Sequence, residues 1–234
     1  MKVVILAGGL GTRISEETAD KPKPMVSING KPILWHIMNI YAQQGLSDFV
    51  IATGYKGEVV SEWVNSLETN WKITAVDTGL DTQTGGRIKM CMDLHPGKRM
   101  LATYGDGVGN INIKELIAFH HSHGKLATLT AVRPPARFGY LDMTNGQVLH
   151  FGEKNQSNAG WINGGYFVLE PKVSGYIKSA SEPFETGALP KLAGEGELMA
   201  FEHGGFWQPM DTLREKQDLE KLALKGNPPW LIDI

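Results

Sequence analysis

The stretch Lys2-Val3-Val4-Ile5-Leu6-Ala7-Gly8-Gly9-Leu10-Gly11-Thr12-Arg13 decides the fold of this 234-residue chain. Its first half is a short apolar run, typical of a strand buried on both faces. Its second half is rich in glycine, so the backbone can pass close to a bulky anion and aim its N–H groups at phosphate oxygens. Thr12 adds a hydroxyl donor and Arg13 a forked cation that suits phosphate. The stretch predicts a phosphate-binding loop after the first strand; the alternative is a plain strand-to-helix turn.

Two better-known phosphate loops are excluded. A P-loop ends in Gly-Lys-Ser/Thr, whereas Gly11 is followed by Thr12-Arg13. A dinucleotide-binding loop needs a third glycine where Ile14 stands, and an acidic residue at the end of the second strand. The candidate second strand, residues 49–53, is followed by Gly54.

Strand-like and helix-like segments alternate after this loop, which favours an α/β fold with a mainly parallel sheet. From residue 134 the pattern changes to a predicted hairpin, residues 138–142 and 147–151, around Asn145-Gly146. This change predicts a subdomain boundary within one domain. The remaining predicted strands are residues 73–76, 99–104, 126–132, 161–169 and 198–201, and the predicted helices cover residues 33–41, 59–64, 113–123, 173–177 and 212–224, with one more opened by residues 82–87.

Composition narrows the class of protein. The chain is 41% hydrophobic and 21% charged with a net charge of −2, so no overall basic excess points to nucleic acid. No apolar stretch is long enough to span a bilayer, and no membrane partner is expected. Met1-Lys2 runs directly into the first strand, which leaves no room for a signal peptide, so we expect a cytoplasmic protein. Cys91 is the one cysteine and is expected in the core.

Lys23 and Asp106 are the first two candidate site residues beyond the loop. Lys23 stands between Pro22 and Pro24, which disfavour an α-helix and favour a rigid, extended strip that can aim an ammonium group at phosphates. Asp106 follows a predicted strand, where ligands of open α/β sheets bind, and a carboxylate beside phosphate suits Mg²⁺. The alternatives are a solvated surface lysine and a turn aspartate.

Three further positions are ambiguous on their own. Asp211 opens the last predicted helix, where a role as N-cap would explain it. Glu153-Lys154 follows the hairpin, and a charged pair leaving a strand is usually solvated. Asn163-Gly164-Gly165 interrupts a strand, where glycine often marks the close approach of a ligand.

Taken together, these motifs resemble the sugar-1-phosphate nucleotidylyltransferases in their order and over essentially the whole chain. Other stretches are similar to those members of the family that transfer a cytidylyl group to glucose 1-phosphate. These stretches are Ser15-Glu16-Glu17-Thr18, residues 31–38, Thr84-Gly85-Gly86-Arg87 and residues 205–212.

The resemblance implies a Rossmann-like mixed, mainly parallel sheet flanked by helices, of the nucleotide-diphospho-sugar transferase type. It implies one nucleotidyltransferase domain, with residues 1–133 binding the nucleotide and a small β-rich part, residues 134–234, binding the sugar. The implied reaction joins CTP and a sugar 1-phosphate, most simply α-D-glucose 1-phosphate, to give a CDP-sugar and pyrophosphate, with Mg²⁺ as cofactor. A homo-oligomer is implied as well, as is a place in nucleotide-sugar synthesis for cell-surface polysaccharide such as O-antigen.

The resemblance also implies roles for individual residues. Arg13 and Lys23 are the catalytic residues, and Asp106 and Asp211 hold the metal. The nucleotide-binding residues are Leu6, Ala7, Gly8, Gly9, Gly11, Thr12, Arg13, Lys23, Thr84, Gly85 and Asp106. The residues for the sugar phosphate are Gly139, Tyr140, Glu153, Lys154, Asn163 and Gly164.

One departure from the family pattern is the short link from Trp63 to Trp71, where the similar cytidylyl enzymes carry extra residues between the second and third strands. The number of subunits and the choice of sugar 1-phosphate therefore stay open. So do two alternatives: the same transfer with UTP or dTTP, and a nucleotide-binding regulatory module that keeps the fold without turnover.

Overall fold

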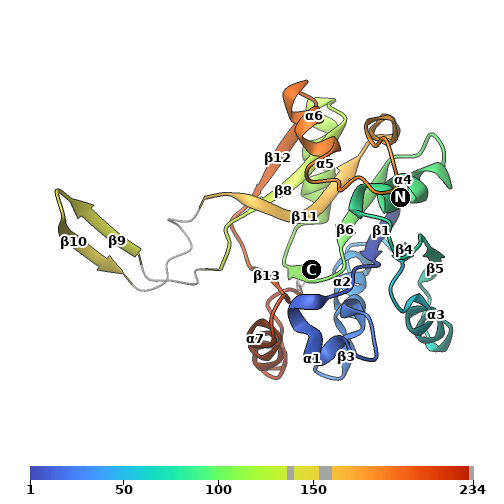
Figure 1. Ribbon diagram of the computed structural model, residues 1–234, viewed down its shortest axis with the longest axis horizontal. Helices are drawn as coiled ribbons and strands as arrows, with labels where there is room; N and C mark the ends of the chain where they lie inside the picture. The colour runs from blue at the N-terminus through green and yellow to red at the C-terminus, as the bar shows by residue number, and fades with distance from the viewer. Residues whose placement is uncertain (136–139, 153–159, 232–234) are drawn as a thin grey trace.

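A seven-stranded sheet in the order β12-β8-β11-β6-β1-β4-β5 forms the centre of the computed structural model (Figure 1). The structure describes residues 1–135, 140–152 and 160–231. Within this sheet, β11 runs antiparallel to β6 and β8, and the other pairs are parallel. The predicted mixed, mainly parallel sheet is therefore confirmed. Its strands are β1 (Lys2–Ala7), β4 (Asp48–Thr53), β5 (Lys72–Asp77), β6 (Met100–Tyr104), β8 (Ala127–Val132), β11 (Ile162–Leu169) and β12 (Leu198–His203).

Helices cover both faces of the sheet and give the chain two cores. On β1, Val3 and Ile5 belong to one core, whereas Val4 and Leu6 belong to the other. The first core is closed by α2 (Ile33–Ala42), α3 (Gly57–Ser66), α5 (Ile113–His123) and α7 (Leu213–Ala223), and the second by α4 (Thr84–Asp93) and α6 (Ala188–Gly194). Each fully buried aliphatic side chain contributes about 1.5–3 kcal/mol. Alternate burial on both faces explains why this strand reads as an unbroken apolar run.

The second part of the chain joins the same sheet. β11 and β12 pair with β6 and β8, while the hairpin β9 (Tyr140–Thr144) and β10 (Gln147–Gly152) projects away from the body (Figure 1). Asn145 and Gly146 at its tip have φ of 50° and 82°, the backbone that a two-residue hairpin turn requires. The hairpin prediction is confirmed. The division at residue 134 stays a prediction.

Several local predictions were wrong or incomplete. Lys23–Met25 forms one turn of 3-10 helix, not the predicted extended strip. Pro24 is tolerated there because an N–H in the first turn of a helix lacks a partner anyway. Helix α6 and the strand β13 were not predicted, since α6 spans only seven residues and β13 only three. Among the described residues, no helix is long and apolar enough to cross a membrane.

Short elements complete the chain. They are the 3-10 turns Thr12–Ile14, Lys23–Met25 and Pro171–Tyr176, helix α1 (Ser15–Thr18), and the strands β2 (Ser27–Ile28), β3 (Lys31–Pro32), β7 (Gly107–Gly109) and β13 (Trp207–Pro209). The most consequential pairing joins β13 to β7, with Pro209 opposite Gly107. It continues in a hydrogen bond from Met210 N–H to the Asp106 carbonyl (2.8 Å), which brings the residues after β13 to the carboxyl end of β6.

Candidate active site

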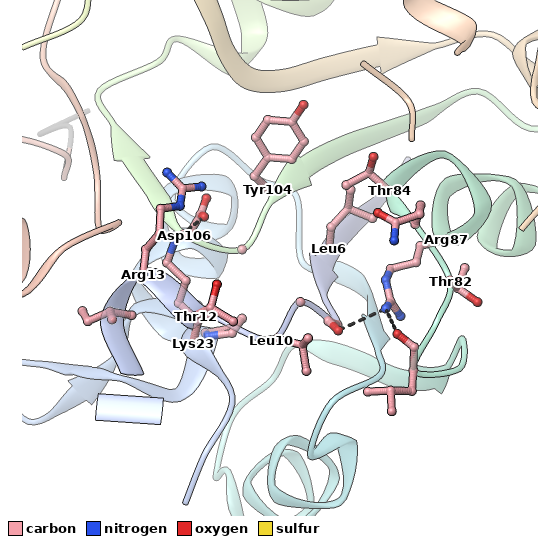
Figure 2. Close-up of a pocket in the computed structure, with 18 residues that line it drawn as sticks. Leu6, Leu10, Thr12, Arg13, Lys23, Thr82, Thr84, Arg87, Tyr104 and Asp106 are labelled. Carbon is pink, nitrogen blue, oxygen red and sulfur yellow. Dashed lines mark hydrogen bonds and ion pairs between the residues drawn. The ribbon is translucent and has the colours of Figure 1, made fainter. Parts of the chain in front are cut away.

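A cavity of about 390 Å³ opens at the carboxyl ends of β1 and β6. Figure 2 shows Arg13, Lys23 and Asp106 grouped on one side of it and Thr82, Thr84 and Arg87 on the other, with Tyr104 between the two groups. The glycine-rich loop is part of its lining. The cavity lies where ligands of open α/β sheets bind, so the loop, Lys23 and Asp106 occupy the predicted place.

Lys23 lies between two carboxylates that are distant in sequence. Its Nζ is 2.6 Å from Asp106 Oδ2 and 2.6 Å from Asp211 Oδ1. The Lys23 side chain is only 10% exposed, which rules out the alternative of a solvated surface lysine. The structure thus brings together three of the predicted site residues around one ammonium group.

The surroundings keep this ammonium group charged. Burial by itself lowers the pKa of Lys23, but Asp106 and Asp211 outweigh it through charge and hydrogen bonds, and the net shift raises the pKa above its ordinary value. Lys23 is therefore protonated throughout the neutral pH range. It can serve as a fixed positive charge and does not act as a proton acceptor.

Asp211 is not the cap of the last helix, so that explanation of its position was wrong. Thr212 is the N-cap: it accepts a hydrogen bond from Glu215 N–H, and the Glu215 carboxylate accepts one from Thr212 N–H in return, a capping box. The Asp211 carboxylate instead accepts from Lys23 and, at 2.7 Å, from the Arg13 guanidinium. Arg13 remains 72% exposed, so it can turn toward a ligand.

Arg87 is a site residue that the sequence analysis missed. It is 4% exposed and donates hydrogen bonds to the carbonyl oxygens of Thr53 (2.7 Å) and Gly8 (3.0 Å), which ties the glycine loop to the end of β4. Figure 2 shows Arg87 at the cavity with the hydrogen bond to Gly8 as a dashed line. Thr78 accepts another hydrogen bond from the same guanidinium. Burial is the main cause that lowers the pKa of Arg87. The sequence did hold a signal for Arg87: the helical periodicity of α4 places this arginine on the side of the helix that faces the core.

We predict that Gly8→Ala damages the fold through Arg87, whereas Gly9→Ala does not. A Cβ at Gly8 would lie 2.2 Å from Arg87 Cζ, but a Cβ at Gly9 would meet nothing within 4 Å. Gly8→Ala should lower the free energy of unfolding by about 1–3 kcal/mol, as overpacking does. Its Tm should fall by about 2–4 °C per kcal/mol for a chain of this size. Thermal unfolding of both variants checks this, and equal Tm values would contradict the role of Arg87.

Thr84 and Gly85, which the family resemblance places where the base of the nucleotide is read, begin α4 and lie against the loop before α6. A Cβ at Gly85 would lie 2.5 Å from the Glu182 carbonyl oxygen, and one at Gly86 would lie 2.2 Å from that of Ala180. Gly85 is buried and is not part of the cavity wall, whereas Thr84 is. These two glycines are explained by close packing of backbone, and contact of Gly85 with a base stays a prediction.

The structure describes some of the residues that were predicted to bind the sugar phosphate. Asn163 and Gly164 lie on β11; the Gly164 carbonyl accepts a hydrogen bond from Trp207 Nε1 (2.9 Å), and Asn163 donates to the Tyr104 hydroxyl (3.0 Å). Tyr140 begins β9, but its side chain lies outside what the structure describes. Gly139, Glu153 and Lys154 also lie outside the described residues, so their roles stay predictions.

The carboxylates Asp106 and Asp211 fit a single metal ion. Both lie at 2.6 Å from the same nitrogen of Lys23, so they converge on one cation position. In residues 1–135, 140–152 and 160–231, no group of three or more histidine, cysteine or acidic side chains gathers into a metal site. Mg²⁺ at phosphate-transfer sites is held by one or two carboxylates, and substrate phosphates and water complete its shell. Two convergent carboxylates beside a phosphate loop meet that requirement.

These features define the class of protein. A glycine-rich loop, two cationic side chains and two carboxylates converge at the end of the sheet. This arrangement suits the direct transfer of a phosphorus-containing group between two bound substrates, a reaction that needs positioning and charge and no activated nucleophile of the protein. Comparison with known proteins agrees: residues 2–213 match the family model described as nucleotidyl transferase. The chain belongs to the nucleotidyl transferase family.

Particular relatives are similar over nearly their full length. The chain is 51% identical to the glucose-1-phosphate cytidylyltransferase of Salmonella typhimurium strain LT2, covering 98% of each chain. It is 42% identical to a probable glucose-1-phosphate cytidylyltransferase of Bacillus subtilis, covering 99% of this chain and all of the relative. The Salmonella alignment spans 253 positions, more than the 234 residues present here, so the relative carries residues that this chain lacks.

Solved structures share the fold. A crystal structure of HddC from Yersinia pseudotuberculosis, complexed with GMP-PN, superimposes with a TM-score of 0.75 at 27% identity and covers 94% of this chain and 98% of that one. A putative glucose-1-phosphate thymidylyltransferase from Bacillus anthracis gives 0.73 at 24% identity, with 95% of each chain covered. The chain therefore has the nucleotide-diphospho-sugar transferase fold that the sequence predicted.

Proposed function

We propose that this chain transfers a cytidylyl group from CTP to α-D-glucose 1-phosphate and releases CDP-glucose and pyrophosphate. The observation that carries the chemistry is the meeting of Lys23, Asp106 and Asp211 beside the glycine-rich loop. The choice of substrates is supported by the names of the relatives that are 51% and 42% identical.

In this reaction a phosphate oxygen of the sugar 1-phosphate attacks the α-phosphorus of CTP. The bond from that phosphorus to the bridging oxygen breaks, and pyrophosphate leaves with the bonding electrons. Such an in-line transfer needs positioning and neutralisation of charge from the protein. The loop of this chain lacks the third glycine of a dinucleotide-binding loop and the Lys-Ser/Thr pair of a P-loop. Neither feature is required for this transfer.

The triphosphate binds, in this proposal, to Gly8, Gly9, Gly11 and Thr12. Backbone N–H groups of the loop and the Thr12 hydroxyl donate to phosphate oxygens, and Arg13 leaves Asp211 to make a forked contact with them. Leu6, Ala7, Thr84 and Gly85 place the nucleoside. Arg87 does not touch the ligand in this scheme; it fixes the loop by holding the Gly8 carbonyl at 3.0 Å.

Asp106 and Asp211 hold Mg²⁺, which, when bound, neutralises charge on the phosphate oxygens. Their two carboxylates are occupied by Lys23 and Arg13 in the structure. Once a triphosphate is bound, Lys23 is released toward the α-phosphate, where its permanent charge stabilises the transition state. One cluster thus exchanges internal ion pairs for contacts to ligand.

The sugar 1-phosphate binds toward β11 and the hairpin. Asn163 and Gly164 line its path from β11, with Gly139, Tyr140 and Glu153 as further sugar contacts and Lys154 as the cation for its phosphate. This division assigns one lysine to each substrate: Lys23 to the nucleotide and Lys154 to the sugar phosphate.

We predict that CTP is the preferred nucleotide, with UTP a poorer substrate. Steady-state kcat/KM should be measured for CTP, UTP, dTTP, ATP and GTP against glucose, mannose and galactose 1-phosphates, with pyrophosphate release as the readout. The CTP and glucose 1-phosphate pair should give the highest value. A maximum with dTTP or UTP would overturn the assignment, and no pyrophosphate with any pair would favour a nucleotide-binding regulatory module.

A further inference from the structure

The Glu185 carboxylate accepts hydrogen bonds from two hydroxyl groups that line the cavity. The Tyr104 hydroxyl donates to its Oε1, and the Thr84 hydroxyl donates to its Oε2 at 2.6 Å. Tyr104 ends β6 and Thr84 begins α4, and both line the cavity. Glu185 itself is not one of the lining residues and lies in the segment that leads into α6.

Each hydroxyl is also an acceptor, which fixes the direction of every hydrogen bond. Thr84 Oγ1 accepts from Phe184 N–H at 2.9 Å, and the Tyr104 hydroxyl accepts from Asn163 Nδ2 at 3.0 Å. Asn163 is oriented in turn, because its Oδ1 accepts from Gly165 N–H at 2.9 Å. An ionised carboxylate only accepts, so both hydroxyl protons point at Glu185.

This network joins the two sides of the proposed active site. Thr84 belongs to the segment assigned to the nucleoside, and Asn163 to the strand assigned to the sugar. The segment that carries Glu185 is itself held to the first turn of α4, because Gln83 N–H donates to the Ala180 carbonyl at 2.9 Å. Burial, and next the charge of Glu185, raise the pKa of Tyr104, so its hydroxyl stays a neutral donor.

We propose that Glu185 is a positioning residue. It orients the Thr84 side chain on the nucleotide side of the site, and it orients Tyr104, and through it Asn163, on the side of the sugar phosphate. The inference rests on the proposed function, because the two substrates define the two sides. The Thr84 hydroxyl donates its proton to Glu185, so this proton is not available to the base.

The decisive variant is Glu185→Gln. Glutamine keeps the volume of glutamate but places an amide donor against one of two hydroxyls that must also donate, so one hydrogen bond is lost or reversed. We expect kcat/KM to fall by about 10–100-fold, the range for hydrogen bonds to a charged group. KM should rise for both CTP and glucose 1-phosphate. Tm should stay within about 3 °C of wild type.

Glu182→Gln is the matched control. Glu182 lies three residues away and pairs with Lys191 at 2.8 Å, outside the cavity wall. The KM values of Glu182→Gln for CTP and glucose 1-phosphate should match those of the wild type. If Glu185→Gln fails to fold, Tyr104→Phe replaces it as the test. This variant removes the hydroxyl and keeps the ring, and its kcat/KM should fall in the same way.

A double-mutant cycle separates positioning from simple loss of structure. If Glu185 acts through Tyr104, the double variant Glu185→Gln with Tyr104→Phe should lose no more kcat/KM than the worse single variant. Additive losses, or KM values of Glu185→Gln equal to those of Glu182→Gln, would overturn the inference. Calorimetric titration of CTP with Mg²⁺ gives an independent arm. Wild type that binds CTP but releases no pyrophosphate once glucose 1-phosphate is added would refute the proposed function alone. A CTP affinity of Glu185→Gln equal to that of the wild type would refute the positioning role alone.

Discussion

Asp211→Asn is expected to lower kcat on the order of 10²-fold or more while the chain stays folded. Asparagine keeps the size of the side chain but removes the charge that faces Lys23 and Arg13 at 2.6 and 2.7 Å. The helix that follows should be unaffected, because Thr212 and Glu215 cap it without this carboxylate. Asp106→Asn should have an effect of the same size, since both carboxylates converge on one cation position.

The measurement is kcat as a function of Mg²⁺ concentration. Both variants should need more Mg²⁺ for half-maximal turnover than the wild type. Asp218→Asn is the matched control, because Asp218 is an acidic residue on α7 that pairs only with nearby Lys221 among the described contacts. Turnover within about twofold of wild type and an unchanged Mg²⁺ requirement in Asp211→Asn would mean that Asp211 does not bind the metal.

Lys23→Ala is expected to give the second large loss, again on the order of 10²-fold in kcat, with little change in the KM for CTP. Charge builds at the α-phosphoryl group in the transition state, and a contact made chiefly there appears in kcat. Lys23→Arg should not restore activity, because a planar fork cannot replace a compact ammonium between two carboxylates at 2.6 Å. Steady-state kinetics with Lys21→Ala as control checks this. A raised KM with normal kcat would show that Lys23 binds the ground state.

Lys154→Ala provides the contrast. Lys154 is assigned to the sugar phosphate, so its loss should weaken binding of glucose 1-phosphate and leave the affinity for CTP with Mg²⁺ nearly unchanged. Separate calorimetric titrations of the two ligands measure this. Loss of CTP binding with normal sugar binding would contradict the division of the site between the two lysines.

The fold was predictable because its signals are local. The apolar run of β1, the glycine that ends α5 in a left-handed conformation (Gly124, φ 65°) and the Asn145-Gly146 turn each follow from a few neighbouring residues. Helix α6 escaped prediction because Ala188–Gly194 spans only seven residues and carries a proline. Pro190 is tolerated because it stands in the first turn of the helix.

The site was predictable as a set of residue types but not as an arrangement. Asp106 and Asp211 meet through the pairing of β7 with β13, three residues each, which no periodicity in the sequence reveals. Lys23 was expected to face phosphates, yet its ammonium group is held by carboxylates 83 and 188 positions away. Arg87 and Glu185 were missed because charged residues in such segments usually face solvent. The burial of Arg87 depends on the close approach of Gly8, where a Cβ would meet the guanidinium.

The most direct test of the account is the fate of the α-phosphorus. Wild-type protein, Mg²⁺ and glucose 1-phosphate should be incubated with CTP that carries sulfur in one configuration at the α-phosphorus, and the product should be analysed by phosphorus NMR. We predict CDP-glucose with inverted configuration and one equivalent of pyrophosphate, because the residues that meet at Lys23 support a single in-line displacement. Retention of configuration would reveal a covalent intermediate, and release of the labelled group as CMP would show hydrolysis; either result would contradict direct cytidylyl transfer.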